Sequence, residues 1–310
     1  MESNVRQTLQ VTPIFSVIVA TRNRRQSLGR FLDALRALPK QPSWELIIVN
    51  NASIDGTARL LSSGVQDLPI VVIKEDLPGK SRALNSALKH ARGEILLFTD
   101  DDVVPDRNWL TALYKGSLEY PSANVFGGRI VVDHKRIPRW IAKSYNLKTI
   151  LTSEQDLGSD IRWFAEDQYP MGPNLAVRRR LIEQGSAAWP LNLGPGTKIP
   201  VGDERAFLMQ VSHPESQDRL YIPDSIVRHQ LKGRQLGFVS ALTRSFLGGY
   251  AAGLVTRTGV HSKRKKKGAL ATAWQRLRKA SSSRELICMV ARALGVLTGT
   301  RTPFARILRG

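Results

Sequence analysis

Residues 96–110, LLFTDDDVVPDRNWL, contain the pattern that decides the fold. Their first apolar residues are typical of a strand buried on both faces of a sheet. The strand ends abruptly in Asp100, Asp101 and Asp102, which repel one another unless a cation lies among them. Oxygen ligands favour Mg²⁺ or Mn²⁺, so the stretch predicts a metal site at a strand end. The alternative is a solvated loop that caps a helix beginning near Asp106.

The residues before this stretch alternate between apolar runs and helical patterns. The runs at 15–20, 46–49 and 70–73 predict three more buried strands, and the spacing of apolar residues at 28–38 and 80–92 predicts two helices. Such alternation with short links predicts an α/β fold with a mostly parallel sheet flanked by helices. Ligands of these sheets bind at the carboxyl ends of the strands, where the three aspartates stand.

The charge of the chain is unevenly distributed. The 310 residues carry a formal net charge of +20, and 42% of them are hydrophobic, enough for a core. Residues 1–227 hold 28 basic and 25 acidic side chains, whereas residues 228–310 hold 18 basic side chains and one acid. A nearly neutral body argues against a uniformly basic nucleic-acid-binding domain.

The cysteine content and the hydropathy of the chain predict the cellular compartment in which the protein lies. Cys288 is the only cysteine, which excludes an internal disulfide and a cysteine-based metal cluster and favours a reducing, cytosolic address. The apolar run at 14–20 is too short for a signal peptide. No run reaches the roughly 18 apolar residues of a spanning helix. The nearest candidate, residues 235–256, is broken by Arg244 and several glycines, so we expect it to be soluble or interfacial.

Two nucleotide-binding motifs are absent. Residues 79–81, GKS, resemble the end of a phosphate-binding P-loop, but Lys74 stands where the loop needs its first glycine. Lys80 nevertheless falls at a predicted helix start, where an ammonium and backbone amides can meet a phosphate. The first strand runs into residues 21–24, TRNR, without a glycine, so a dinucleotide-binding enzyme is disfavoured.

Seven segments in order resemble the inverting family-2 glycosyltransferases with the GT-A fold, and they span residues 15–231. They are FSVIVATRNR (15–24), LIIVNNASIDGT (46–57), PGKSRALNSAL (78–88), LLFTDDDVVPDRNWL (96–110), MGPNLAVRR (171–179), VGDERAFL (201–208) and YIPDSIVRHQL (221–231). Each motif is weak alone, and seven in order are specific.

The resemblance implies a site for a nucleotide-sugar donor. Thr21 and Asn23 match positions that line the base and ribose, and Asn51 matches a base-contacting position. Relatives often have an acid near there, so the departure leaves uracil, guanine or another base open. Lys80 and Asn85 match the stretch near the diphosphate and sugar.

The resemblance also implies the metal ligands. Asp100 and Asp102 match the two ends of the family's Asp-x-Asp motif, with Asp102 as the direct ligand, and Asp101 contacts ribose or sugar. His229, after the closing strand, helps to hold the metal or diphosphate, with a structural role as the alternative. Asn174 matches a segment near the acceptor and the donor sugar, with a turn as the alternative.

The catalytic base falls at residues 203–204. Inverting transfer is a single displacement, which needs a carboxylate to accept the proton of the acceptor hydroxyl. The family usually has Glu-Asp with the aspartate as base, whereas this chain has Asp203 and then Glu204. Position favours Glu204 and residue type favours Asp203. Both could instead only begin a helix, where acids suit the dipole.

We therefore expect two parts: a GT-A domain at 1–231 and a basic, partly amphipathic helical extension at 232–310. The run SKRKKK at 262–267 predicts attraction to anionic lipid headgroups, worth about 1 kcal/mol per basic residue. A solvated loop is the first alternative, and nucleic acid is an unlikely partner because no recognisable module accompanies the run. The expected location is cytoplasmic, peripheral on the inner face of the plasma membrane.

The sequence as a whole predicts metal-dependent transfer of a sugar from a nucleotide-diphosphate sugar to a lipid-linked, polysaccharide or other acceptor. Two alternatives remain at this point. One is a sugar-phosphate nucleotidylyltransferase, which would normally have a glycine-rich loop with an arginine after the first strand. The other is a catalytically idle carbohydrate- or nucleic-acid-binding protein on the same fold.

Overall fold

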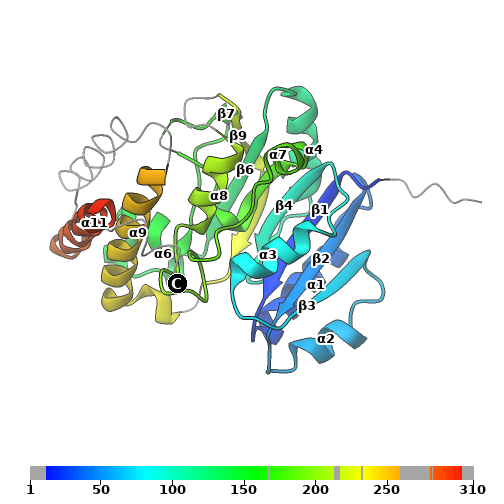
Figure 1. Cartoon of the computed structure of the whole chain (residues 1–310), viewed down its shortest axis with the longest axis horizontal. Helices are drawn as coiled ribbons and strands as arrows, with labels where there is room; N and C mark the ends of the chain where they lie inside the picture. Colours follow the sequence, from blue (N-terminus) through cyan, green and yellow to red (C-terminus); the bar gives the residue numbers. More distant parts are fainter. Residues whose placement is uncertain are drawn as a thin grey trace, which may run out of the picture.

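Figure 1 shows the protein as a computed structural model, in which helices cover both faces of a central sheet. The structure describes residues 12–166, 168–212, 217–231, 233–258, 280 and 282–301. The basic run at 262–267 lies outside these residues.

One half of the sheet is parallel, as the sequence predicts. Its strands, in spatial order, are β3 (Ile70–Glu75), β2 (Trp44–Asn51), β1 (Phe15–Thr21) and β4 (Ile95–Asp100). Every neighbouring pair among these four is parallel, and the apolar residues of β1, β2 and β4 are buried. The predicted runs therefore form strands because helices cover both of their faces.

The other half of the sheet is mixed, so the whole sheet is less parallel than the first hundred residues indicate. It continues from β4 through β8 (Leu175–Arg178), β6 (Val125–Val132), β9 (Arg219–His229) and β5 (Val103–Pro105), with β7 (Arg162–Trp163) also paired to β9. β6 and β9 are parallel, whereas β8 is antiparallel to both of its neighbours and β9 is antiparallel to β5 and β7.

Helices pack a hydrophobic cluster against each face of the sheet. They are α1 (Arg25–Arg36), α2 (Thr57–Ser63), α3 (Lys80–Leu88), α4 (Trp109–Glu119), α5 (Arg139–Ala142), α6 (Tyr145–Thr152), α7 (Arg180–Gly185) and α8 (Asp203–Val211). The cluster under α1 and α4 contains Phe31 and Trp109, and the one under α3 and α8 contains Trp189 and Phe207. All four rings are almost completely buried.

The third helix is shorter than the predicted range of 80–92. It ends at Leu88, because the chain must then approach β1 closely. A Cβ atom on Gly93 would lie 2.3 Å from the backbone nitrogen of Ser16. The backbone N–H of Arg92 donates to the buried carboxylate of Glu45 at 2.7 Å, which fixes the exit from the helix.

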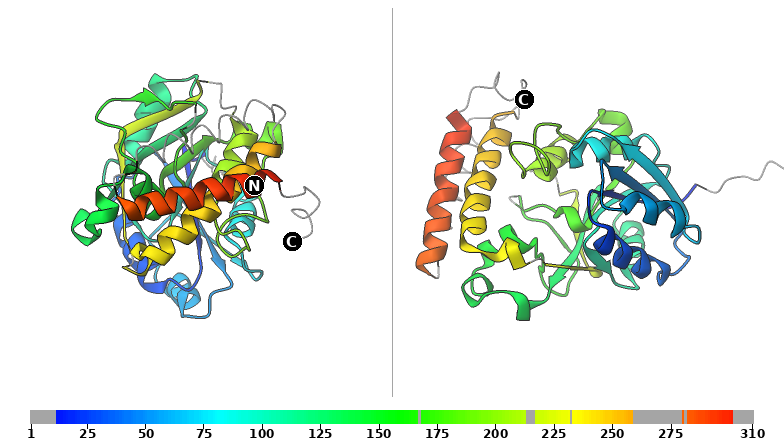
Figure 2. Two further views of the ribbon diagram at one scale, coloured as in Figure 1. Left: turned by 90° about the vertical axis from the view of Figure 1, so that its left-hand side faces the viewer. Right: turned by 90° about the horizontal axis from the view of Figure 1, so that it is seen from below.

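Two long C-terminal helices, α9 (Phe238–Thr258) and α11 (Ser283–Arg301), lie side by side at the end of the molecule opposite β3 (Figures 1 and 2). Figure 2 shows that they run in the same direction. Glycines let their backbones touch: a Cβ atom on Gly249 would lie 2.0 Å from the carbonyl oxygen of Arg292. No helix among the described residues is long and apolar enough to cross a membrane.

A third hydrophobic cluster joins this helix pair to the sheet domain. It combines Val132 and Leu151 with Ala241 of α9 and Cys288 of α11. Glu285, the single acid of the basic region, is buried and accepts a hydrogen bond from the Ser144 hydroxyl. Residues on both sides of the boundary predicted at residue 231 therefore contribute to this third cluster.

Candidate active site

A cavity of about 540 Å³ opens at the carboxyl ends of β1 and β4, between the start of α8 and helices α6 and α9. Nine of the twelve residues that the sequence nominates line it: Thr21, Asn51, Lys80, Asp100, Asp101, Asp102, Asp203, Glu204 and His229. The other three, Asn23, Asn85 and Asn174, do not line it. The cavity therefore lies at the edge of the sheet where the strand-end rule predicts ligand binding, and the roles of these residues stay predictions.

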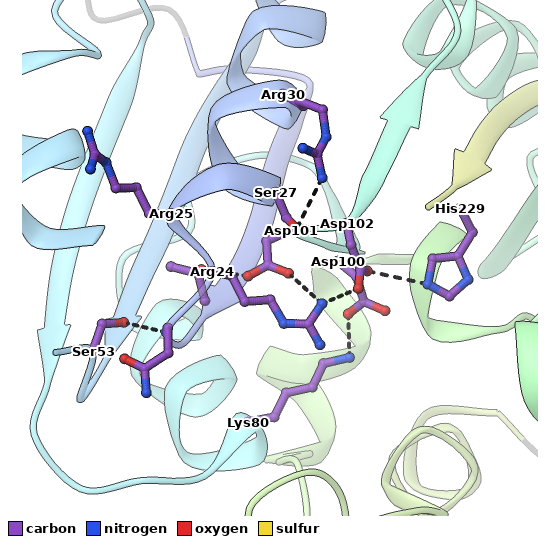
Figure 3. A network of polar contacts seen from close by, with 12 residues as sticks. Arg24, Arg25, Ser27, Arg30, Ser53, Lys80, Asp100, Asp101, Asp102 and His229 are labelled. Carbon is purple, nitrogen blue, oxygen red and sulfur yellow. Dashed lines mark hydrogen bonds and ion pairs between the residues drawn. The ribbon is translucent and has the colours of Figure 1, made fainter. Parts of the chain in front are cut away.

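The three aspartates are not a solvated loop, because Asp101 and Asp102 are only 4% and 5% exposed. Thr21 donates its hydroxyl to Asp101 at 2.5 Å, and the Arg24 guanidinium lies between Asp101 and Asp102 (Figure 3). Burial, with the charges of the other two aspartates, raises the pKa of Asp101 to about 7, although Arg24 and Thr21 act in the opposite direction.

Asp102 faces His229 because β5 pairs with β9. The register places Val103 opposite His229, and the His229 Nε2 atom lies 3.3 Å from the Asp102 Oδ1 atom. Burial alone would raise the pKa of Asp102, but His229 and Arg24 hold it well below its usual range. In the same way, burial would lower the pKa of His229, and its hydrogen bond with Asp102 raises it instead.

Lys80 connects the aspartates to the carboxylates of α8. Its Nζ atom lies 2.6 Å from the Asp100 Oδ1 atom, as Figure 3 shows. Burial alone would lower the pKa of Lys80, but the negative charges of Asp100, Glu204 and Asp203 raise it above its usual value. Lys80 therefore stays protonated, and its charge lies between the strand-end carboxylates and those of α8.

Asp203 and Glu204 begin α8, and both line the cavity. Burial raises the pKa of Asp203, which is 3% exposed, and its Oδ2 atom has no hydrogen-bond partner among the described residues. Burial and the charge of Asp203 raise the pKa of Glu204 to about 8, although Lys80 and the Gly172 backbone favour its ionised form. Asp203 is buried and Glu204 is half-buried, whereas two carboxylates that only began a helix would be solvated, and a catalytic role for either stays a prediction.

The donor atoms around Asp102 fit a divalent cation. The His229 Nδ1 atom lies 2.7 Å from the carbonyl oxygen of Thr152, which only accepts, so Nδ1 carries a hydrogen and the Nε2 atom is left to face Asp102. Loss of the Nε2 hydrogen that bonds Asp102 would give the neutral ring a lone pair for a cation held beside Asp102. No group of three or more histidine, cysteine or acidic side chains converges on a metal-sized site within the described ranges. Two protein ligands suit Mg²⁺ or Mn²⁺ when substrate phosphates complete the coordination.

Two asparagines that are expected to bind the nucleotide form hydrogen bonds with backbone groups of nearby loops. Asn51 lines the cavity, but its side chain donates to the Leu77 carbonyl at 2.7 Å and accepts from the Gly79 backbone N–H at 2.8 Å. Asn23 is exposed, and its side-chain oxygen accepts from the Ile54 backbone N–H at 2.7 Å. These bonds give both amides a structural task, and nucleotide contact by either stays a prediction.

Asn85 and Asn174 lie away from the cavity and bind backbone. Asn85 accepts from the Trp189 N–H at 2.8 Å and donates to the Trp189 carbonyl at 2.9 Å. Asn174 accepts from the Trp109 indole at 2.9 Å and donates to the Ser225 carbonyl at 2.8 Å. The amides of these two residues are engaged in hydrogen bonds within the protein, and neither residue lines the cavity. Their position therefore does not support the expected contacts with sugar and acceptor.

Five arginines that the sequence did not nominate line the cavity, namely Arg22, Arg24, Arg205, Arg244 and Arg292. Arg24 directly follows Asn23, so its place after the first strand was a usable signal. Arg244 on α9 and Arg292 on α11 had no such signal. They belong to the region assigned to the extension, and only packing brings them to the site.

Solved structures with nucleotide sugars share the fold. A mannosyltransferase from Pyrobaculum calidifontis in complex with GDP-Man and Mn²⁺ aligns with a TM-score of 0.62 over 93% of this chain and 88% of its own, at 20% identity. Residues 1–349 of Staphylococcus aureus TarS in complex with UDP-GlcNAc align with a TM-score of 0.59 over 87% of this chain and 74% of that one, at 17% identity. At these identities the likeness establishes the fold, which is GT-A.

The sequence family follows from a separate comparison. The family model described as glycosyl transferase family 2 matches residues 16–185, more than half of the chain, and the chain belongs to this family. That membership confirms the resemblance and removes the nucleotidylyltransferase alternative. The match ends before Asp203, Glu204 and His229, which the motif resemblance nominates and which line the same cavity as the strand-end aspartates.

Curated relatives cover parts of the chain. The probable glycosyltransferase YdaM of Bacillus subtilis is 26% identical over 188 residues, 58% of this chain and 44% of its own length. A poly(ribitol-phosphate) beta-glucosyltransferase of Bacillus spizizenii is 23% identical over 201 residues, 63% of this chain and 28% of its own. The chain thus spans less than half the length of these relatives.

Proposed function

We propose that the protein transfers a glycosyl group from a nucleotide-diphosphate sugar to an acceptor hydroxyl, with inversion at the anomeric carbon and with Mg²⁺ or Mn²⁺. One observation carries the proposal: the strand-end aspartates and the Asp203–Glu204 pair line the same cavity, with Lys80 between them. A leaving diphosphate and a base for the acceptor are the two requirements of a single displacement, and each has a matching set of side chains here.

Glu204 is the general base in this proposal. Asp203 is almost completely buried, and a Cβ atom on the neighbouring Gly194 would lie 2.6 Å from its carboxylate carbon. Glu204 is more accessible, and its pKa of about 8 makes it a stronger proton acceptor than an ordinary glutamate. Once ionised, its carboxylate can accept the proton of an acceptor hydroxyl while Lys80 limits the cost of the charge.

The opposite side of the cavity suits the leaving group. Asp102 and His229 would hold the metal ion, which would supply positive charge to the departing diphosphate. Lys80, protonated beside Asp100, contributes a second positive charge that needs no rearrangement. Thr21 and Asp101 lie next to these groups and can bind the hydroxyls of the donor.

The direct test is a donor panel. The purified protein would be incubated with UDP-, GDP- and dTDP-sugars and Mn²⁺ or Mg²⁺, and free nucleotide would be measured. Metal-dependent nucleotide release from at least one donor is expected, and NMR of the product should show an inverted anomeric configuration. Absence of release together with absence of any nucleotide-induced thermal shift would refute the proposal.

The acceptor in this proposal is a glycan or lipid-linked intermediate at an anionic membrane surface. Helix α11 presents a stripe of exposed apolar side chains, namely Leu286, Ile287, Val290, Leu294 and Leu297, which are 36–53% exposed. The same region, 228–310, carries 18 basic residues and one acid. Basic charge in the same stretch of sequence as an apolar helical stripe favours binding in the headgroup layer. Relatives named for poly(ribitol-phosphate) glucosylation and O-antigen biosynthesis agree with such an acceptor.

Vesicle sedimentation tests this location. The full chain should sediment with phosphatidylglycerol-containing vesicles and remain in solution with phosphatidylcholine alone. Replacing Leu294 and Val290 by serine should weaken sedimentation while leaving nucleotide binding unchanged, since both side chains are exposed and neither lines the cavity. Equal sedimentation with both lipids, or none with either, would contradict the membrane proposal and leave glycosyl transfer untouched.

A further inference from the structure

The C-terminal helix pair supplies one wall of the cavity. Arg244, Gly248, Ala251 and Val255 of α9 line it, together with Arg292 of α11. This wall contributes two guanidinium groups to the cavity and no carboxylate. The five carboxylates that line the cavity come instead from the carboxyl end of β4 and the start of α8.

Arg244 is a partly buried cation with unused hydrogen-bond donors. Its Nη1 atom donates to the Leu151 carbonyl at 3.3 Å, and the described residues offer it no carboxylate within salt-bridge distance. Burial lowers the pKa of Arg244, and the negative charge of Asp102 offsets this only in part. A guanidinium has five N–H donors, so most of them remain available to a ligand in the cavity.

Arg292 reaches the same cavity from α11 because α9 has glycines, which lack side chains, where the two helices touch. A Cβ atom on Gly248 would lie 2.8 Å from the Arg292 Nη1 atom, so the guanidinium lies against the bare backbone of α9. A larger residue at position 248 would compete for the space that the guanidinium occupies. The two arginines thus come from helices that are separate in sequence and line one cavity.

Two other cations of the cavity pair with the strand-end aspartates, and Arg22 and Arg205 also line it. Arg24 pairs with Asp101 and Asp102, and Lys80 pairs with Asp100. These ion pairs balance the strand-end carboxylates, whereas no acid of α9 or α11 lines the cavity beside Arg244 and Arg292. The electrostatics of this wall therefore favour an anionic ligand.

We propose that Arg244 and Arg292 form a binding site for a phosphate group of a substrate. Planar guanidinium groups bind phosphate oxygens through paired hydrogen bonds, and a partly buried position strengthens such bonds. The chemical class of the ligand rests on the proposed function, in which the phosphate belongs either to the donor diphosphate or to a phosphorylated acceptor. The helix pair is then a component of the active site, and this role is independent of its proposed role at a membrane.

Titration calorimetry on the full chain tests the site. The probes are UDP, GDP and inorganic pyrophosphate, each with Mg²⁺, and inorganic phosphate with and without a saturating nucleoside diphosphate. The variants are Arg244→Gln, Arg292→Gln and the matched control Arg301→Gln, which removes a charge from exposed Arg301 at the end of α11, away from the cavity. Loss of a charged hydrogen bond should raise Kd about tenfold or more, which corresponds to about 1.4 kcal/mol.

Two results would support the proposal and identify the source of the phosphate. Weaker nucleoside diphosphate or pyrophosphate binding in Arg244→Gln and Arg292→Gln assigns the site to the donor. Unchanged nucleotide binding with weaker inorganic phosphate binding beside the nucleotide assigns it to the acceptor. The proposal is overturned if both variants bind every probe as the parent does, or if Arg301→Gln weakens binding equally.

The design separates this proposal from the proposed function. If the unmodified protein binds pyrophosphate through Arg244 but releases no nucleotide from any donor, the phosphate site is supported and the proposed enzymatic function is refuted. If Arg244→Gln fails to give a cooperative thermal transition, Arg244→Lys keeps the charge and stem and removes the planar fork. Arg244→Lys should then fold and bind the same probe several-fold more weakly than the parent, and parental affinity would count against the site.

Discussion

Glu204→Gln should abolish turnover and stabilise the fold at alkaline pH. The glutamine keeps the size of the side chain and an oxygen for the Gly172 backbone N–H, but it cannot accept a proton. Loss of a general base typically lowers a rate 10²–10⁴-fold. The stability gain follows from the pKa of Glu204, which burial and Asp203 raise from 4.5 to about 8.

The sign of the stability change follows from proton linkage. Between pH 4.5 and 8 the folded chain holds a proton on Glu204 that the unfolded chain releases, so the free energy of unfolding falls as pH rises through this range. At 1.36 kcal/mol per pH unit the ceiling is about 5 kcal/mol above pH 8. Solvent screening at the half-buried Glu204 side chain reduces the expected gain to about 1–3 kcal/mol.

Thermal denaturation at pH 5 and pH 9, without metal or nucleotide, measures the effect. At pH 9 Glu204→Gln should have a Tm several degrees above that of the parent, since 1 kcal/mol shifts the Tm of domains of 150–250 residues by about 2–4 °C. At pH 5 the two should differ little, because Glu204 is protonated. The control Glu119→Gln, at an exposed carboxylate, should show no difference at either pH.

Two results would refute the reasoning. A Tm below that of the parent at both pH values would show that the Glu204 carboxylate stabilises the fold, contrary to its raised pKa. Retained glycosyl transfer in Glu204→Gln, together with loss of transfer in Asp203→Asn, would assign the base to Asp203.

Three further predictions concern the metal ligands and the buried amides. Asp102→Asn should weaken Mn²⁺-dependent nucleotide binding about tenfold or more in calorimetry, whereas Asp106→Asn, at an exposed side chain, should leave it unchanged. Equal effects of the two substitutions would disprove the assignment of Asp102 as a metal ligand. His229→Gln should likewise lower Mn²⁺ affinity, detected by electron paramagnetic resonance of free Mn²⁺, and unchanged affinity would give His229 a structural role. Asn174→Ala should lower the free energy of unfolding, measured with urea, by about 2–4 kcal/mol, because the Trp109 indole and two carbonyls lose their hydrogen-bond partners. The control Asn108→Ala, at an exposed side chain, should cost under about 0.5 kcal/mol, and an equally small cost for Asn174→Ala would contradict the prediction.

The sequence predicted the strands and the edge of the sheet that carries the site. Period and apolar content specify a buried strand locally, and parallel strands place their carboxyl ends together, so the sequence is enough to nominate the strand-end residues. It did not predict the tasks of Asn51, Asn85 and Asn174. An asparagine amide binds a backbone carbonyl or a ligand with the same atoms, and only its surroundings decide between them.

The sequence by itself determined a family-2 chain with aspartates at a strand end and a candidate base at residues 203–204. Tertiary structure alone decided that Arg24 lies between two of those aspartates and that Arg244 and Arg292 line the same cavity. The division at residue 231 followed the end of the last matched motif, and the structure shows a third hydrophobic cluster with residues from both sides of that position. The reason is physical: charge and periodicity are local properties of a sequence, whereas burial, ion pairing and pKa depend on groups that folding brings together from distant segments.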